Sequence, residues 1–555
     1  MYTQVYDPVG NSLFASSIFA ALPIIALFVL LGGLKLKAHV ASALALLVGL
    51  IVAVAVYSMP VGQAVNSGIE GAAFGLFPIM WIVWNAIWIY NLTVATGHFQ
   101  VLRRSFSSIS DDQRIQAVMI AFCFGALLEA LAGFGTPVAI TAVMLIAVGF
   151  KPIKAAAVAL VANTAPVAFG AIAIPIVTLA GLTELPKEDL GAMVGRQTPF
   201  LALIVPLILV GMVDGMRGVR QTWPAAVVGG FVFALGQFAC SNFISVELTD
   251  IVASLLGAGA IVLLLRVWQP SEPLLGDAPE GGRPAMAGAA VSDSAHEAEV
   301  RRRDGKGSDS RADVIKAYAP YLIIIVIFGF AQWAPVKSFL ESLGTELKWP
   351  GLNVVDADGE DLTSLTYKLN VADAAGTLLL VAGLLTMAVL RVGPGRALRV
   401  YGQSLDQLKW ATLTVALVLG LAYVLNQSGQ TITLGLWIAG AGGLLGFLSS
   451  IIGWLGVAVT GSDTSSNSLF GVLQVEAARE AGLDPTLLAA ANSSGGVLGK
   501  MVSPQNLAIG AAAVGLGGQE GELFRRVLGW SLLLLLLMCI LVYLQSTPVL
   551  GWMVV

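Results

Sequence analysis

The feature that most constrains this chain is a series of apolar runs, each long enough to cross a lipid bilayer. A membrane-spanning helix needs roughly 20 predominantly apolar residues. Charged residues make up only 12% of the chain, whereas soluble domains carry roughly 25%. We therefore predict an all-α polytopic membrane protein with about 12 transmembrane helices. The clearest runs are Ile18–Leu34, Val40–Tyr57, Phe74–Tyr90, Ile251–Leu265, Tyr321–Trp333, Ala374–Leu390 and Leu528–Leu544.

The composition argues against several classes of function. The net charge is −4 and no basic stripe is present, so we expect no binding to nucleic acid. The three cysteines and three histidines are scattered among separate segments, which provides no disulfide framework, metal site or nucleophile–base constellation. No phosphate-binding loop suggests coupling to ATP. We expect a protein that is not an enzyme and that holds no cofactor.

Basic residues near the ends of spans predict which loops are cytoplasmic. Basic loops alternate with loops poor in bases, such as the mainly acidic Val336–Asn370, if both termini lie on the outer face. Segment 269–313 then lies in the cytoplasm, and its composition predicts a disordered linker. Met1–Ser12 has no Lys or Arg, so we expect no cleavable signal peptide. The basic set is Lys35/Lys37, Arg103/Arg104, Lys151/Lys154, Arg217/Arg220, Arg301–Arg303, Arg391/Arg396/Arg399 and Arg525/Arg526.

Two segments break this alternation, and both turn at glycine. Segment 115–150 has both ends on the basic side and turns at Ala132–Pro137. Segment 450–479 has both ends on the opposite side and turns at Thr460–Asn467. Two full crossings would also fit the charges, but the mid-segment glycines favour tips buried inside protein. We predict two re-entrant hairpins that enter the membrane from opposite faces.

Each hairpin is followed by a segment with the same spacing of asparagine, glycine and proline. Glycine follows Asn163 by seven residues and proline follows it by twelve, and the same spacing follows Asn492. We expect two broken helices, 155–180 and 486–514, interrupted at Asn163/Thr164 and Asn492/Ser493. Paired interrupted segments in two halves point to a transporter's binding site. The predicted inverted repeats are 13–220 and 314–555, joined by a two-helix connector, 221–268 with its second helix at 249–267, and by the linker 269–313.

The residues around the hairpins resemble those of the L-lactate permease family. The likeness is carried by Phe122–Thr141, Val161–Gly170, Gly453–Asn467 and Gly499–Gln505, and it runs over nearly the full length of the chain. It implies import of L-lactate by proton symport across a bacterial inner membrane, with D-lactate and glycolate as further substrates and lipid as the surroundings. It also implies kinship with elevator-type ion transporters, in which a transport domain carrying two hairpins moves against a scaffold domain.

Helix N-termini and small polar side chains are suitable ligands for the carboxylate and hydroxyl of lactate. Free N–H groups and the partial positive charge of a helix N-terminus bind anions at low desolvation cost. The alternative is that glycine and serine here only allow close helix packing. The expected substrate-binding residues are Gly133, Gly135, Thr136, Asn163, Thr164, Gly461, Ser462, Thr464, Ser465, Asn467, Asn492, Ser493 and Lys500.

Two acidic residues in apolar surroundings are candidates to carry the coupled proton. Glu129 lies four residues before Gly133, and Asp463 lies in the second tip. Burial disfavours the ionised form of a carboxyl group, and acids inside the membrane are by default functional hypotheses. Glu129 has the alternative of a fixed pair with Lys500, and Asp463 that of capping a helix. Lys500 is expected either to bind the lactate carboxylate or to neutralise a buried acid.

Other readings stay open from the sequence. Serine, threonine and asparagine at the tips also suit a sodium-coupled carboxylate transporter, and an anion channel is a weaker alternative. The remaining charged or titratable residues at span ends are expected to be interfacial. They are Arg196, Asp214, His39 and His98, while His296 lies in the linker and has no expected role.

Overall fold

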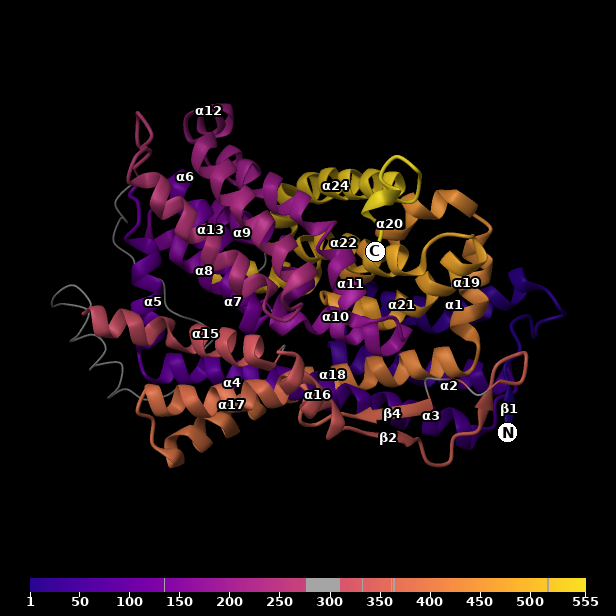
Figure 1. Ribbon diagram of the computed structural model, residues 1–555. Helices are drawn as coiled ribbons and strands as arrows, with labels where there is room; N and C mark the ends of the chain where they lie inside the picture. Colours follow the sequence, from indigo (N-terminus) through magenta and orange to yellow (C-terminus); the bar gives the residue numbers. More distant parts are fainter. Residues whose placement is uncertain (134, 276–309, 332, 361, 363–364, 517–518) are drawn as a thin grey trace.

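The computed structural model describes residues 1–133, 135–275, 310–331, 333–360, 362, 365–516 and 519–555. Most of the predicted linker 269–313, with Arg301–Arg303 and His296, lies outside these residues, as does Phe134 in the first tip. The described chain is mostly helical, and its long helices form two layers (Figure 1).

One layer consists of long helices from both ends of the sequence, and we call it the long-helix layer. Its axis is α18, which packs against α2, α3 and α4, while α17 packs against α4 and α15. In Figure 1 this layer runs along the bottom of the molecule. The bounds are α2 (Ala38–Ala55), α3 (Val61–Phe74), η2 (Gly75–Met80), α4 (Trp81–Ala95), α15 (Arg311–Ala331), α16 (Ala334–Ser342), α17 (Ala375–Val389) and α18 (Pro394–Gln427).

The second layer contains the two predicted hairpins and lies above the first in Figure 1; we call it the hairpin layer. Its first half is α6 (Gln113–Gln116), η3 (Ala117–Phe124), α7 (Gly125–Ala132), α8 (Thr136–Ala147), α9 (Pro152–Ala162), η4 (Val167–Phe169), α10 (Gly170–Thr183), α11 (Lys187–Val194), α12 (Thr198–Phe243) and α13 (Thr249–Leu265). Its second half is η6 (Gly442–Leu444), α20 (Leu445–Thr460), α21 (Asp463–Glu480), α22 (Pro485–Gly499), η7 (Lys500–Val502), α23 (Pro504–Ala513) and α24 (Glu520–Gln545).

The two halves of the hairpin layer pack reciprocally. Helix α10 of the first half packs against α21 of the second, and α23 of the second half packs against α8 of the first.

Within the second half, small residues permit a close approach of the helices α20 and α22. A Cβ atom on Gly453 would lie 1.9 Å from the Asn492 carbonyl oxygen, and one on Gly495 would lie 2.2 Å from that of Ser450. Such small-residue contacts let helix backbones meet inside a membrane protein.

The remaining elements join the layers at their edges. Helices α1 (Leu13–Phe28) and α19 (Gln430–Ala439) pack together, and α19 also packs against α21. Helix α5 (His98–Ser107) packs against α15. Helix α12 runs through a kink at Asp214–Gly215, where the φ of Gly215 is +61°. Two short elements, η1 (Val29–Gly33) and η8 (Gly551–Met553), follow α1 and α24 respectively.

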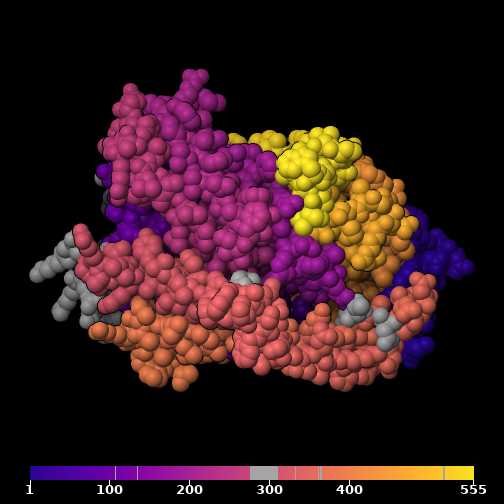
Figure 2. Space-filling view, in the orientation of Figure 1, coloured from indigo at the N-terminus to yellow at the C-terminus, as the bar shows by residue number. Residues whose placement is uncertain are grey.

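The acidic loop Val336–Asn370 contains more regular structure than the all-α prediction allowed. Strand β2 (Thr345–Lys348) pairs antiparallel with β4 (Thr366–Leu369), and β1 (Tyr2–Thr3) pairs in parallel with β3 (Val354–Val355). The buried Tyr2 hydroxyl donates to the carbonyls of Tyr57 and Ser428, which ties the N-terminal segment to the long-helix layer. Figure 2 shows the segment from α15 to strand β4 as a band below the hairpin layer.

The number of spans is smaller than expected. Within the described ranges, nine helices are long and apolar enough to cross a membrane, or up to ten if the bent pair Pro152–Ala162 and Val167–Thr183 forms one span. Four further apolar helices are shorter, with 10–17 residues each. They are Thr136–Ala147, Thr249–Leu265, Ala375–Val389 and Gln430–Ala439.

Candidate functional site

A cavity of about 520 Å³ lies where the two hairpin tips meet the long-helix layer. Gly133 of the first tip and Gly461 of the second both line it, so the structure brings together the two tips that the sequence singled out. Of the expected site residues, eight line the cavity: Glu129, Gly133, Gly461, Ser462, Asp463, Thr464, Ser465 and Lys500. A small anion such as lactate would fill only part of this volume.

A buried ion pair joins the two halves of the hairpin layer at the cavity wall. The Lys500 ammonium lies 2.7 Å from Glu129 Oε1, and their side chains are 8% and 4% exposed. Asn163 Nδ2 donates to the other carboxylate oxygen of Glu129 at 2.9 Å. The backbone crowds this carboxylate, since a Cβ atom on Gly170 would lie 2.8 Å from Oε1. The pair therefore forms as the sequence analysis considered, and both partners remain at the cavity.

The second tip presents the N-terminus of α21 to the cavity. Gly461 has a φ of +76°, and the Ser462 hydroxyl caps the helix by accepting from the Ser465 N–H at 3.2 Å. The capping role considered for Asp463 thus belongs to Ser462. Asp463 Oδ2 instead accepts from the Ser493 hydroxyl at 2.5 Å, and Oδ1 has no hydrogen-bond partner among the described residues.

The first broken helix is interrupted over a long stretch. Helix α9 ends before Asn163, and the two halves of the segment are bent by 66°. Ala171, Ile172 and Ala173 adopt left-handed conformations, with φ of 46°, 58° and 57°. Such a conformation costs about 1–2 kcal/mol for each residue that has a Cβ atom. Gly170 and Ala171 line the cavity, so this strained backbone belongs to the site.

The expected break at Asn492/Ser493 is wrong. Both residues lie inside the continuous helix α22 (Pro485–Gly499), and the interruption comes at η7, Lys500–Val502, before Pro504 starts α23. Glycine within α22 does not break it, because Gly495 and Gly496 pack closely against α20 and Asp463. Pro504 has no backbone N–H to continue the preceding helix, but it is tolerated at the first position of a new one, so the boundary between the two helices lies just before it.

Several of the predicted site residues do not line the cavity but form hydrogen bonds within the segments that do or next to them. Asn467 Nδ2 donates to the Pro175 carbonyl, and its Oδ1 accepts from Asn492 Nδ2 at 2.9 Å. Thr164 donates to the Val161 carbonyl, and the Thr136 N–H closes the first tip onto the Gly133 carbonyl. The predicted residues outside the cavity are Asn467, Asn492, Thr164, Thr136, Asn163, Gly135 and Ser493.

Asn506 links the two tips, although the sequence did not single it out. Its Nδ2 donates to the Gly461 carbonyl, and a Cβ atom on Gly135 would lie 3.3 Å from its Oδ1. Asn506 lies two residues after Pro504, in the segment identified as a broken helix, and this position was the only signal available for it.

The cavity wall in the long-helix layer was not predicted. It consists of Lys37 and His39 at the start of α2 and of Trp410, Thr414 and Val415 on α18. The rings of His39 and Trp410 stack with centroids 4.5 Å apart. His39 was expected at a membrane interface, and only its closeness to a basic span end hinted at this position.

The other charged residues considered earlier lie outside the cavity. Arg196 donates to Asn242 and to the Met553 carbonyl, and Asp214 pairs with Arg114 at 3.1 Å beside the kink of α12. His98 contacts the Thr96 hydroxyl at the start of α5. Within the described chain, no group of three or more His, Cys, Asp or Glu side chains is arranged to hold a metal ion.

Comparison with known proteins decides the family. The model of the L-lactate permease family matches residues 16–549. This chain belongs to the L-lactate permease family. The L-lactate permease of Bacillus subtilis is 42% identical to this permease, and the alignment covers 100% of both chains. The glycolate permease GlcA of Escherichia coli is 40% identical over 100% of this chain and 99% of its own. The Escherichia coli L-lactate permease is also 40% identical over the full length of both.

Membership makes this permease a multi-pass membrane protein and a transporter rather than an enzyme, in agreement with its many apolar helices. Among solved structures, MtrF of Neisseria gonorrhoeae aligns with 87% of this permease and 83% of its own chain, at a TM-score of 0.46 and 14% identity. That likeness is too distant to indicate function.

Proposed function

We propose that this permease imports L-lactate, together with D-lactate and glycolate, by proton symport across the bacterial inner membrane. Relatives that align over its full length are named L-lactate permease and glycolate permease. Both substrates are small 2-hydroxy monocarboxylates. The cavity offers what such an anion needs: the buried ammonium group of Lys500, hydroxyls at a helix N-terminus and two carboxyl groups, with the exposed Lys37 at its wall.

The observation that carries the proposal is the Lys500–Glu129 contact of 2.7 Å on the cavity wall. One buried ammonium cannot neutralise two carboxylates at once, and an uncompensated charge at this depth is costly. When the substrate carboxylate binds Lys500, Glu129 loses its counter-ion and takes up a proton. Binding of one anion thus requires binding of one proton, and the loaded site has the same net charge as the empty one.

The second tip supplies the remaining contacts. The N-terminus of α21 carries a partial positive charge that favours an anion. The hydroxyls of Ser462, Thr464 and Ser465 lie at this helix end and line the cavity. We assign the substrate carboxylate to the space between Lys500 and these hydroxyls. The 2-hydroxyl of the substrate then donates to Asp463, whose Oδ1 is free of other hydrogen bonds in the described structure.

We propose alternating access between the two layers. We infer an inverted repeat in which the hairpin layer carries the substrate and the long-helix layer is the scaffold. The reciprocal packing of α10 with α21 and of α23 with α8 supports a hairpin layer that moves as one unit. The side chains of Trp410 and Thr414 face the site from the scaffold, and movement of the hairpin layer would change this contact.

The test is uptake of labelled lactate into proteoliposomes that hold wild-type protein or Glu129→Gln. The amide keeps the shape of the side chain and one acceptor oxygen but cannot carry the coupled proton. We expect Glu129→Gln to lose accumulation driven by an inside-alkaline pH gradient and to retain lactate–lactate exchange. Glu70→Gln is the matched control, because Glu70 is also fully buried and bonded to Gln427 but lies outside the cavity.

Unchanged pH-driven accumulation in Glu129→Gln would show that Glu129 is not the proton carrier. If wild-type accumulation follows an imposed sodium gradient at constant pH instead, the permease is sodium-coupled. Non-saturable conductance without accumulation would identify an anion channel.

A further inference from the structure

Outside the cavity, the hairpin layer buries a further acid, Asp250. Unlike Glu129, it has no cationic partner among the residues that the structure describes. Asp250 lies in the first turn of α13, is 0% exposed, and sits where α13 packs against α12 and α7. Its Oδ1 accepts from Gln237 Nε2 at 3.1 Å. Its Oδ2 has no hydrogen-bond partner, and none of the ion pairs found within the described chain includes Asp250.

The surroundings of Asp250 do not compensate a full negative charge. The nearest titratable groups on the packed elements are Glu129 on α7, Cys240 on α12 and Glu247 in the preceding loop, and none of them is a cation. The N-terminus of α13 contributes only a partial positive charge. A buried carboxylate without a counter-ion costs several kcal/mol. Asp250 is therefore poised to exchange a proton rather than to hold an ion pair.

Gln237 connects Asp250 to the first broken helix, whose Asn163 donates to Glu129. Gln237 Nε2 donates to the Ala165 carbonyl at 3.2 Å as well as to Asp250. Ala165 lies in the break of the first broken helix, two residues from Asn163, which donates to Glu129. Asp250 on α13 and Glu129 on α7 thus lie on two helices that pack together, and the side chain of Gln237 joins Asp250 to the break that follows α9.

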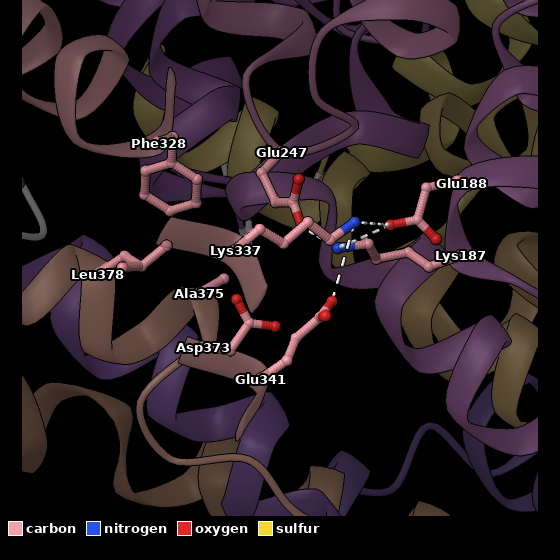
Figure 3. A pocket seen from close by; sticks show the side chains of 9 residues that line it. All are labelled: Lys187, Glu188, Glu247, Phe328, Lys337, Glu341, Asp373, Ala375 and Leu378. Atoms are coloured by element: carbon pink, nitrogen blue, oxygen red, sulfur yellow. Dashed lines mark hydrogen bonds and ion pairs between the residues drawn. The ribbon is translucent and has the colours of Figure 1, made fainter. Parts of the chain in front are cut away.

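The loop just before Asp250 contributes to a charged recess. Glu247, three residues earlier, is 5% exposed and lies 2.5 Å from the Lys187 ammonium. Both residues line a recess of about 60 Å³ together with Asp373 and Glu341 (Figure 3). Burial raises the pKa of the Asp373 carboxyl there. The loop pattern of the sequence predicts that this recess faces the outside.

We propose that Asp250 transfers the coupled proton between the recess and Glu129. The protonated Asp250 carboxyl gives its proton to the Glu129 carboxylate and then takes up another proton from the outer side, so that it carries a negative charge only between the two transfers. This inference rests on the proposed proton symport and adds a residue to it. Gln237 positions Asp250 by fixing one of its oxygens and leaving the other available for the proton.

The test uses full-length protein in proteoliposomes with labelled lactate. Asp250→Asn keeps the volume and the hydrogen bond to Gln237 but removes the exchangeable proton. We expect pH-driven uptake to fall about a hundredfold or more, the lower end of the range for loss of a positioned proton-transfer group. Lactate–lactate exchange at equal pH needs no net proton movement and should stay near the wild-type rate. Asp250→Glu should restore part of the pH-driven uptake, and Glu70→Gln serves again as the control.

The outcomes separate this inference from the proposed function. Normal pH-driven uptake in Asp250→Asn would overturn the role of Asp250 and leave Glu129 untouched. Equal loss of uptake and exchange in Asp250→Asn and Asp250→Glu would assign Asp250 a structural role and also overturn the proposal. A wild-type protein without pH-driven uptake would overturn the proton symport, and this inference with it.

Discussion

Lys500 and Glu129 lie 371 positions apart in the sequence and form a charged contact between the two halves of the hairpin layer. Desolvation makes a buried ion pair a poor source of net stability, but removal of one partner leaves an uncompensated charge. The pair is well suited to transport for the same reason, because an arriving carboxylate can compete for the ammonium only if Glu129 becomes neutral. Stability and coupling are thus linked at these two residues.

This link predicts non-additive stability effects. Lys500→Met should destabilise the protein by about 3–5 kcal/mol, as expected when one partner of a buried pair is removed. Adding Glu129→Gln should recover much of that loss, because the double variant buries no unpaired charge. Thermal unfolding of purified single and double variants in detergent measures the effect. A double variant as unstable as the sum of its singles would contradict a coupled pair.

Among the elements, the hairpin tips owe their shape to glycine. Gly461 has a φ of +76° and Gly135 one of +83°, and both conformations are open to glycine at little cost. The tip of the second hairpin also has no room for a side chain, since a Cβ atom on Gly461 would lie 2.7 Å from Gln505 Oε1. Gln505 lines the cavity, so a change at the tip reaches the substrate directly.

A pair of alanine substitutions separates backbone strain from crowding. Gly482 also has a positive φ, +67°, but a Cβ atom there would have nothing within 4 Å. Both Gly461→Ala and Gly482→Ala should therefore lose about 1–2 kcal/mol of stability from the left-handed backbone. Only Gly461→Ala should also weaken lactate uptake, because it displaces Gln505. Uptake at low lactate concentration and thermal unfolding would detect this, and equal uptake in the two variants would argue against the tip as a binding element.

Across the whole molecule, the two layers meet at the recess in Figure 3 through charged side chains. The Lys337 ammonium on α16 lies 3.6 Å from Glu188 Oε1 on α11, and this contact joins the long-helix layer to the hairpin layer. Glu188 is 59% exposed, so its contact is weak and easily broken. Such a contact would permit the sliding of one layer along the other in the alternating-access mechanism that we propose.

Cross-linking tests that movement. In the variant Glu188→Cys/Lys337→Cys, a short thiol-specific cross-linker should stop lactate transport, and cleavage of the linker should restore it. Cys123, Cys240 and Cys539 are buried, so the reagent should act on the introduced pair. The control Lys337→Cys/Glu341→Cys joins two positions within α16, whose charged atoms are 4.0 Å apart, and should transport normally after cross-linking. Full transport by the cross-linked first variant would exclude relative motion of the layers at this point.

The amino-acid sequence was sufficient to predict the family, the membrane-spanning class, the glycine tips and both cavity acids. These features depend on local composition and on the backbone freedom of single residues, such as Gly461. The spacing of glycine and proline was also enough to locate the helix break near Asn163. The same spacing gave a wrong break at Asn492, where close packing keeps Gly495 and Gly496 inside a helix. The inverted repeat and the re-entrant course of the hairpins stay predictions.

Tertiary structure decided which residues share the cavity. The wall formed by His39 and Trp410, the link of Asn506 between the tips and the isolation of Asp250 could not be read from spacing along the chain. The physical reason is that partners far apart in sequence meet only after the layers pack. Whether a buried carboxyl finds a cation, as Glu129 does, or an amide, as Asp250 does, depends on that packing.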